Sequence, residues 1–173
     1  EANIIIEDSN STNNANMIGV ATNDMYFVTN TAERLRIDSS GKVGIGLTNA
    51  SSYYGNQLVV NAPNEAGITM VGATDGESYL MWADGTSGGE RYRGFIGYSH
   101  ASNYMRFATG SSERMRIDST GNVGIGTSSP STYDSRSNNL VVGDSGDAGV
   151  TIFSGATSNA RLQFAPSGST GLD

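Results

Sequence analysis

The chain has no cysteine, a single histidine, a single tryptophan and only three prolines among its 173 residues. Because thiols are absent, a disulfide framework, a thiolate nucleophile and a zinc–thiolate site are all excluded. Only 16% of the residues are charged, and the net charge of −7 opposes a general affinity for nucleic acid or an anionic membrane. No hydrophobic run approaches the roughly 18 residues of a transmembrane helix. We therefore expect no nucleic-acid partner and no membrane insertion.

Small and turn-forming residues dominate what is present. Glycine, serine, asparagine and threonine occupy 77 of the 173 positions, and hydrophobic residues make up 36%. This composition excludes a large helical bundle, and the β-branched and aromatic residues fall in short clusters between turn dipeptides. The sequence therefore predicts an all-β fold of short antiparallel strands. The expected strands include residues 58–60, 67–71, 78–83, 94–99, 104–108, 114–118 and 122–126.

An internal repeat organises the chain. Residues 33–46 read ERLRIDSSGKVGIG and residues 113–126 read ERMRIDSTGNVGIG, with 11 of 14 positions identical at an offset of 80. Such self-similarity indicates tandem modules of about 80 residues. We expect residues 1–50 to be the C-terminal part of a first unit that ends in the VGIG hairpin. Residues 51–130 would be a complete unit ending in the second hairpin, and residues 131–173 the N-terminal part of a third, truncated unit. The chain is expected to be a segment of a longer polypeptide.

The repeat continues downstream at an offset of 82 and also indicates which side chains face inward. Residues 58–60 match residues 140–142, and residues 66–69 match residues 148–151. Comparison of the two copies predicts that alternate apolar residues face a core and their neighbours face solvent. The residues expected to face inward are Leu80, Trp82, Met105 and Phe107, with Arg106 facing outward.

Each repeated motif predicts a β-hairpin. Apolar residues alternate with Arg34 and Arg36 on the first strand and with Gly44 and Gly46 on the second, and Gly41 supplies the positive φ of the loop. Bare glycines weaken a strand unless another backbone or ring approaches closely. We interpret the arginine and glycine residues as candidates for packing between chains. The arginines are expected to bond to Glu33, to Asp38 or to carbonyls of a neighbouring chain, because the guanidinium fork bridges such groups well. The equivalent residues of the second copy are Arg114, Arg116, Gly124 and Gly126.

Oligomerisation is expected because a unit of 80 residues with this composition buries little apolar surface alone. Disulfides, metals or association of chains usually compensate for a thin core. Without cysteine, and with few metal ligands, association remains, in a closed arrangement that covers strand edges.

The phrase R-[LM]-R-I-D-S-[ST]-G-[KN]-V-G-I-G, which continues into residues 127–130 in the second copy, resembles the repeats of bacteriophage tail fibres. It is most similar to fibres of marine and cyanobacterial phages, whose repeats often precede an endosialidase-type intramolecular chaperone domain. The resemblance implies an elongated, parallel homotrimeric fibre of interlocked β-repeat modules in the virion, outside the cell. Its implied partners are its own copies, other tail proteins, and a glycan or protein of the host surface.

Residues for catalysis or metal binding are sparse. His100 lies in a polar loop between two expected strands, with no nucleophile elbow around it. Asp144 and Asp147 offer oxygen ligands for calcium, but their spacing matches no calcium loop, and aspartate is common in turns of this kind. We therefore expect no enzyme activity, no cofactor and no metal site.

Three tyrosines follow the two motifs and are candidates for receptor contact. Tyr53, Tyr54 and Tyr133 lie beside serine and asparagine in loops, as in many carbohydrate and protein contact surfaces, although packing beneath the loop is the alternative.

The sequence leaves three functions open. The first is a structural and adhesive segment of a trimeric tail fibre that projects receptor-binding regions toward the host. The second is a depolymerase module, similar to a tailspike, that cuts host glycan with a pair of carboxylates. The third is a repeat of a bacterial surface adhesin or filament.

Overall fold

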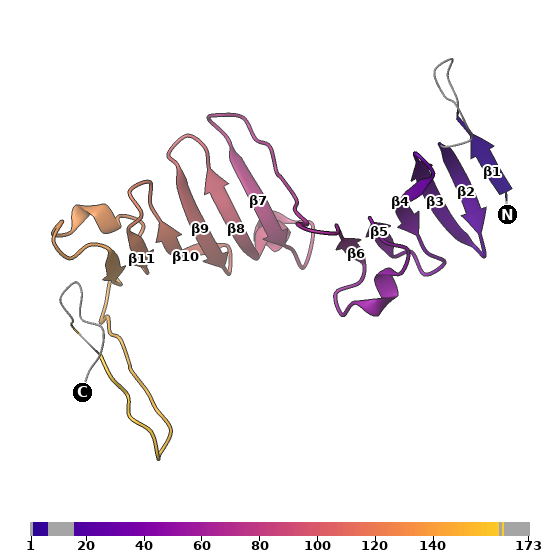
Figure 1. Cartoon of the computed structure of the whole chain (residues 1–173). Helices are drawn as coiled ribbons and strands as arrows, with labels where there is room; N and C mark the ends of the chain where they lie inside the picture. Colours follow the sequence, from indigo (N-terminus) through magenta and orange to yellow (C-terminus); the bar gives the residue numbers. More distant parts are fainter. Residues whose placement is uncertain (1, 7–15, 163, 165–173) are drawn as a thin grey trace. The chain divides into compact units, whose positions relative to one another are not determined.

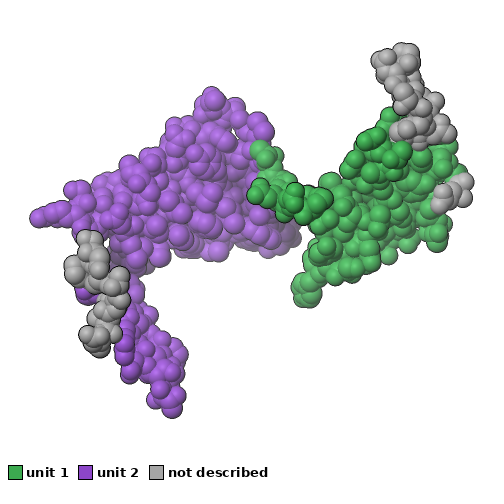
Figure 2. All heavy atoms as spheres, in the orientation of Figure 1, with its two compact units in different colours: residues 1–69 green, residues 70–173 purple. Residues whose placement is uncertain are grey.

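The computed structural model describes residues 2–6, 16–162 and 164. The chain divides into two compact units, Glu1–Thr69 and Met70–Asp173 (Figure 2). Each unit contains one six-stranded β-sheet. Within the described residues the helices are three short 3-10 turns of three to five residues. The prediction of an all-β fold is therefore confirmed. Residues 165–173, which end the predicted third unit, lie outside the described residues.

The sheet of the first unit is a meander that ends in one parallel pair (Figure 1). Its strands are β1 (Ala2–Ile5), β2 (Met17–Ala21), β3 (Asp24–Thr29), β4 (Ala32–Ile37), β5 (Val43–Ile45) and β6 (Leu58–Val60). Neighbours from β1 to β5 pair antiparallel, and β6 returns parallel to β5 after the 3-10 turn η1 (Ala50–Ser52).

The sheet of the second unit has the same strand order and the same final parallel pair. Its strands are β7 (Glu77–Trp82), β8 (Gly94–Ser99), β9 (Tyr104–Thr109), β10 (Ser112–Ile117), β11 (Val123–Ile125) and β12 (Leu140–Val142). The 3-10 turns η2 (Gly88–Tyr92) and η3 (Pro130–Thr132) precede β8 and β12. In both sheets the motif forms the expected hairpin: Arg36 is opposite Gly44 in β4–β5, and Arg116 is opposite Gly124 in β10–β11.

Six of the seven strands expected from the sequence are present, with ends that differ by at most two residues. The expectation of a strand over residues 67–71 is wrong, because these residues form no strand in the structure. These residues pair with no strand edge within the described chain, and an unpaired strand has no ladder to stabilise it.

Cross-strand pairing gives each sheet two chemically different faces. Residues that are opposite one another in a ladder point to the same face. We call the face that carries two continuous rows of mainly hydrophobic side chains the apolar face, and the opposite one the arginine face. On the first sheet the apolar rows are Ile4–Ile18–Phe27–Leu35–Ile45–Val60 and Val20–Met25–Ile37–Val43–Leu58. On the second sheet they are Leu80–Ile96–Phe107–Met115–Ile125–Val142 and Tyr98–Met105–Ile117–Val123–Leu140.

The face of each sheet that is buried within the chain is the opposite of the face that the sequence predicts to be buried. Leu80 and Trp82 are 52% and 54% exposed, whereas the side chain of Arg106 is only 22% exposed. The expectation that Leu80, Trp82, Met105 and Phe107 face a core is therefore wrong for a single chain. The buried hydrophobic side chains of the strands lie on the arginine face instead; they are Tyr26, Val59, Phe95, Ala108 and Val141. The apolar faces are left to solvent.

Candidate functional site

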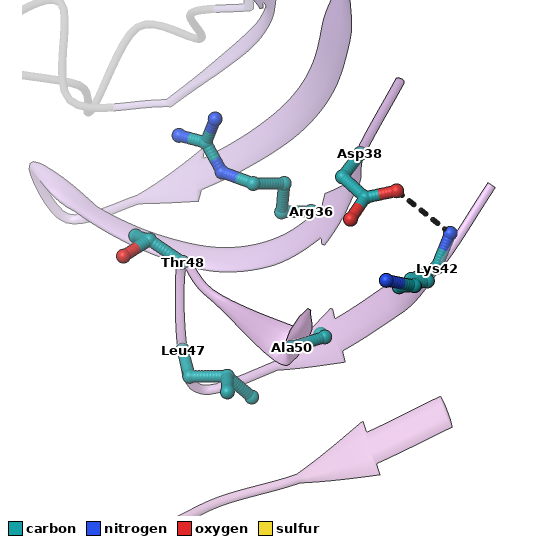
Figure 3. Close-up of a pocket in the computed structure, with 7 residues that line it drawn as sticks. Arg36, Asp38, Lys42, Leu47, Thr48 and Ala50 are labelled. Atoms are coloured by element: carbon teal, nitrogen blue, oxygen red, sulfur yellow. Dashed lines mark hydrogen bonds between the residues drawn. The ribbon is translucent and has the colours of Figure 1, made fainter. Parts of the chain in front are cut away.

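The turn of each motif hairpin is organised by an aspartate. In the first copy the Oδ1 of Asp38 accepts a hydrogen bond from the backbone N–H of Ser40 at 2.9 Å. It accepts a second from the backbone N–H of Lys42 at 3.0 Å (Figure 3). Gly41 has a φ of +81°, which confirms the conformation expected there, and its N–H donates to the Asp38 carbonyl. The aspartate therefore closes the loop that sets the register of the two strands.

Asp118 performs the same task in the second hairpin. Its Oδ1 accepts from the N–H groups of Thr120 and Asn122 at 2.9 and 3.0 Å, and from the Thr120 hydroxyl at 2.7 Å. Desolvation acts to raise the pKa of Asp118, but hydrogen bonds from Thr120 and Asn122 outweigh it and lower this pKa below its usual value. The ionised carboxylate is thus the form that stabilises the turn.

The lowered pKa of Asp118 predicts a pH-dependent contribution to stability. Because its pKa is lower in the folded chain than in the unfolded chain, the contribution is present above the unfolded value near 4 and is lost as the pH falls through the folded value. Asp118→Asn is expected to lower the melting temperature at pH 7, and this difference from the native chain is expected to shrink at pH 3. Thermal unfolding at both pH values checks this. The exposed Asp147→Asn is the control, and an equal loss at both pH values would contradict the assignment.

A β-bulge places the charged groups of the motif on one face. The pairing of β3 with β4 shifts at Arg34, so that Glu33 and Arg36 lie on the same side of the sheet. The Nε of Arg36 donates to Glu33 Oε1 at 2.7 Å and its Nη1 donates to Asp24 Oδ2 at 2.8 Å. Its guanidinium also lies 5.5 Å from the ring centroid of Tyr26. Hydrogen bonds to Glu33 and Asp24 raise the pKa of Arg36, which stays charged.

The second sheet repeats this cluster with an additional arginine. Arg116 donates from Nε and Nη2 to the two carboxylate oxygens of Glu113, at 2.8 and 2.9 Å. Arg106 donates to Glu77 Oε2 at 2.6 Å and to the Tyr79 hydroxyl at 2.8 Å. The Arg106 guanidinium lies 5.1 Å from the centroid of Phe95. Each carboxylate is therefore held by an arginine of the same sheet.

The arginines and glycines expected to pack between chains have partners within the chain. The bulge residues Arg34 and Arg114 are exposed and donate to the Oγ1 of Thr29 and Thr109, at 3.2 and 3.3 Å. Arg36 and Arg116 are bonded as above. Contact of these residues with a neighbouring chain stays a prediction.

Both glycines of each VGIG ending are approached by a carbonyl oxygen of their own chain. A Cβ at Gly44 would lie 2.8 Å from the Leu47 carbonyl, and one at Gly46 would overlap the Asn61 carbonyl oxygen. The equivalent approaches in the second copy are Gly124 to the Thr127 carbonyl and Gly126 to the Gly143 carbonyl. The close approach inferred from the glycines is therefore made by the returning segment of the same chain, and packing between chains at these positions stays a prediction.

The tyrosines proposed for receptor contact lie after the 3-10 turns. Tyr53 and Tyr133 follow η1 and η3, and their N–H groups donate to the carbonyls of Ala50 and Pro130. Both are about half exposed, and Tyr54 is fully exposed. They offer aromatic surface to solvent, and their role in receptor contact stays a prediction.

His100 and the hollow beneath the first hairpin are the remaining features near the motifs. The Nε2 of His100 lies 2.9 Å from the Ser78 hydroxyl oxygen and the ring contacts Tyr98 edge-on, so this loop histidine is half-buried. Among the described residues, no group of three or more histidine, aspartate and glutamate side chains could hold a metal ion. The hollow beneath the first hairpin, lined by Arg36, Asp38 and others, has no room for a water-sized molecule (Figure 3).

The sequence did not predict that Asp24, Glu77 and Tyr26 contact the arginines of the arginine face. It also did not predict that Arg106 lies on this face and bonds to Glu77 and Tyr79. The one available signal was the glutamate that precedes R-[LM]-R in both copies.

In the part of the chain that the structure describes, no helix has the length and hydrophobicity needed to cross a membrane. The chain matches no protein-family model, and it matches no curated protein.

Proposed function

We propose that this chain is a structural and adhesive segment of an elongated homotrimeric fibre of the phage tail fibre type. In this role it projects receptor-binding regions from the virion and contributes to attachment at the host surface. It acts as a scaffold and contact surface and not as a catalyst, and the exposed Tyr53, Tyr54 and Tyr133 are its candidate contacts with host glycan or protein. Several fibres on one particle would make weak contacts cumulative.

The observation that carries the proposal is the apolar face of each sheet. In each sheet one uninterrupted row of hydrophobic side chains crosses all six strands, and a second row crosses five of them. Half or more of the side-chain surface is exposed at Ile4, Leu58, Leu80 and Trp82. Monomeric soluble proteins rarely expose contiguous apolar patches of this kind unless a partner covers them.

The apolar faces of the two sheets are the surfaces that we propose to be covered by association. The repeated motif and its resemblance to tail fibres favour identical copies as the partners that cover this surface.

The experiment that tests the proposal is the absolute mass of the native, unheated protein by light scattering after size exclusion. We expect three times the chain mass, and we expect the assembly to resist mild detergent until it is heated, since interlocked chains separate slowly. A mass equal to one chain across the accessible concentration range would overturn the fibre proposal. In that case the apolar faces would have to serve a different partner.

A further inference from the structure

One segment after each sheet has the composition of a strand but no strand partner among the residues that the structure describes. Residues 66–71 read AGITMV and residues 148–153 read AGVTIF, at the 82-residue offset of the repeat. Both are rich in β-branched and large apolar residues, and neither contains a charge or a proline. The sequence alone predicts a strand at residues 67–71. In the chain, neither these residues nor residues 148–153 form a strand (Figure 1).

The backbone of these segments is unpaired within the described chain. No backbone–backbone hydrogen bond joins residues 62–72, or residues 146–153, to any other described residue. Their apolar side chains are also uncovered: Val71 is 91% exposed and Phe153 is 87% exposed. An uncharged apolar window of this length, with free donors and acceptors, readily pairs with another strand edge.

Open space lies beside the first of these segments, residues 66–71, on the apolar side. A cavity of about 420 Å³ is lined by Leu58, Val60, Ala66, Gly67 and Ile68, and Leu58 and Val60 belong to the apolar rows of the first sheet. A second cavity of about 300 Å³ lies in the other unit, between Met70 and apolar-face residues that include Leu80, Ile96 and Met105. A further chain can therefore reach the segment and the apolar face together.

We propose that residues 66–71 and 148–153 become β-strands by hydrogen bonding to a strand edge of a second copy of this chain. This inference rests on the proposed function, because it requires the oligomer, and it names the segments through which the copies interlock. A second copy is the occupant that fits: it presents uncharged apolar rows, and it repeats the same open segment at the same 82-residue spacing. A partner of unrelated sequence would have to offer matching edges at both positions.

Amide hydrogen exchange on the native full chain, with its mass measured on the same sample, tests the proposal. In the oligomer we expect the amides of residues 67–71 and 149–153 to exchange at least about a thousandfold more slowly than in an unstructured peptide, because strand amides exchange only when the ladder opens. Thr69→Pro removes one donor and should abolish this protection in residues 67–71 and weaken the oligomer. Asn64→Pro, which changes an exposed residue just before the segment, should do neither.

The outcomes separate this inference from the fibre proposal. An oligomer with rapid exchange in both segments overturns the strand pairing and leaves the proposed function standing. A single chain with rapid exchange overturns both. A single chain with slow exchange in these segments also overturns the strand inference, because the protection would then come from within the chain.

Discussion

Leu80→Asp is expected to convert the oligomer into single chains while the β-sheet spectrum is retained. Leu80 lies in a row of the apolar face and is 52% exposed in the chain, so an aspartate there is solvated in the monomer and costs the fold of the monomer little. At an interface between copies the same carboxylate would be buried without a partner, at a cost of several kcal/mol for each chain. Light scattering should show the mass falling to one chain.

A matched control separates this effect from the added charge. Ser119→Asp adds the same charge at an exposed turn residue of the second hairpin and should leave the mass unchanged. If Leu80→Asp kept the full mass, the apolar face of the second sheet would not be an interface between copies. Loss of the β-sheet spectrum in Leu80→Asp would instead show that the side chain supports the fold of the chain itself.

The local geometry of the motif could be predicted from the sequence because neighbouring residues determine it. Alternation and a turn glycine are enough to place Arg36 opposite Gly44, and the positive φ of Gly41 follows from the same pattern. The bulge at Arg34 could not be predicted in this way, since it depends on the pairing with β3. Because of that bulge, Glu33 and Arg36 share a face, which simple alternation would place on opposite sides.

The orientation of the sheets was predicted incorrectly for a physical reason. The hydrophobic pattern identifies which residues share a face, and Leu80 and Phe107 do lie on one face. The pattern does not state what covers that face. In the chain, the returning loops cover the arginine face, where Pro130 of η3 is fully buried, and the apolar face is left open. A sheet face that is buried between chains and one that is buried within a single chain produce the same alternation of apolar and polar residues in the sequence.

The second large effect is expected at the glycine that ends the repeated motif. Gly126 has a φ of +75°, and a Cβ there would overlap the carbonyl oxygen of Gly143, whose N–H donates to the Ile125 carbonyl. Gly126→Ala therefore combines left-handed strain of about 1 kcal/mol with an overlap that costs about 1–3 kcal/mol, because the obstructing atom is backbone. The melting temperature should fall by roughly 10 °C or more.

Two further glycines separate these contributions. Gly121 has a φ of +89° but open space around it, so Gly121→Ala should cost only the backbone strain, about 1 kcal/mol. Gly146 has open space and no positive φ, so Gly146→Ala should leave the melting temperature unchanged within a few degrees. If Gly126→Ala kept its stability but lost the oligomer, the glycine would be required by a neighbouring chain and not by the returning segment of its own. We expect the loss of stability to be largest for Gly126→Ala, smaller for Gly121→Ala and smallest for Gly146→Ala. This order would show that the VGIG motif ends in glycine because glycine permits the parallel pairing of β11 with β12.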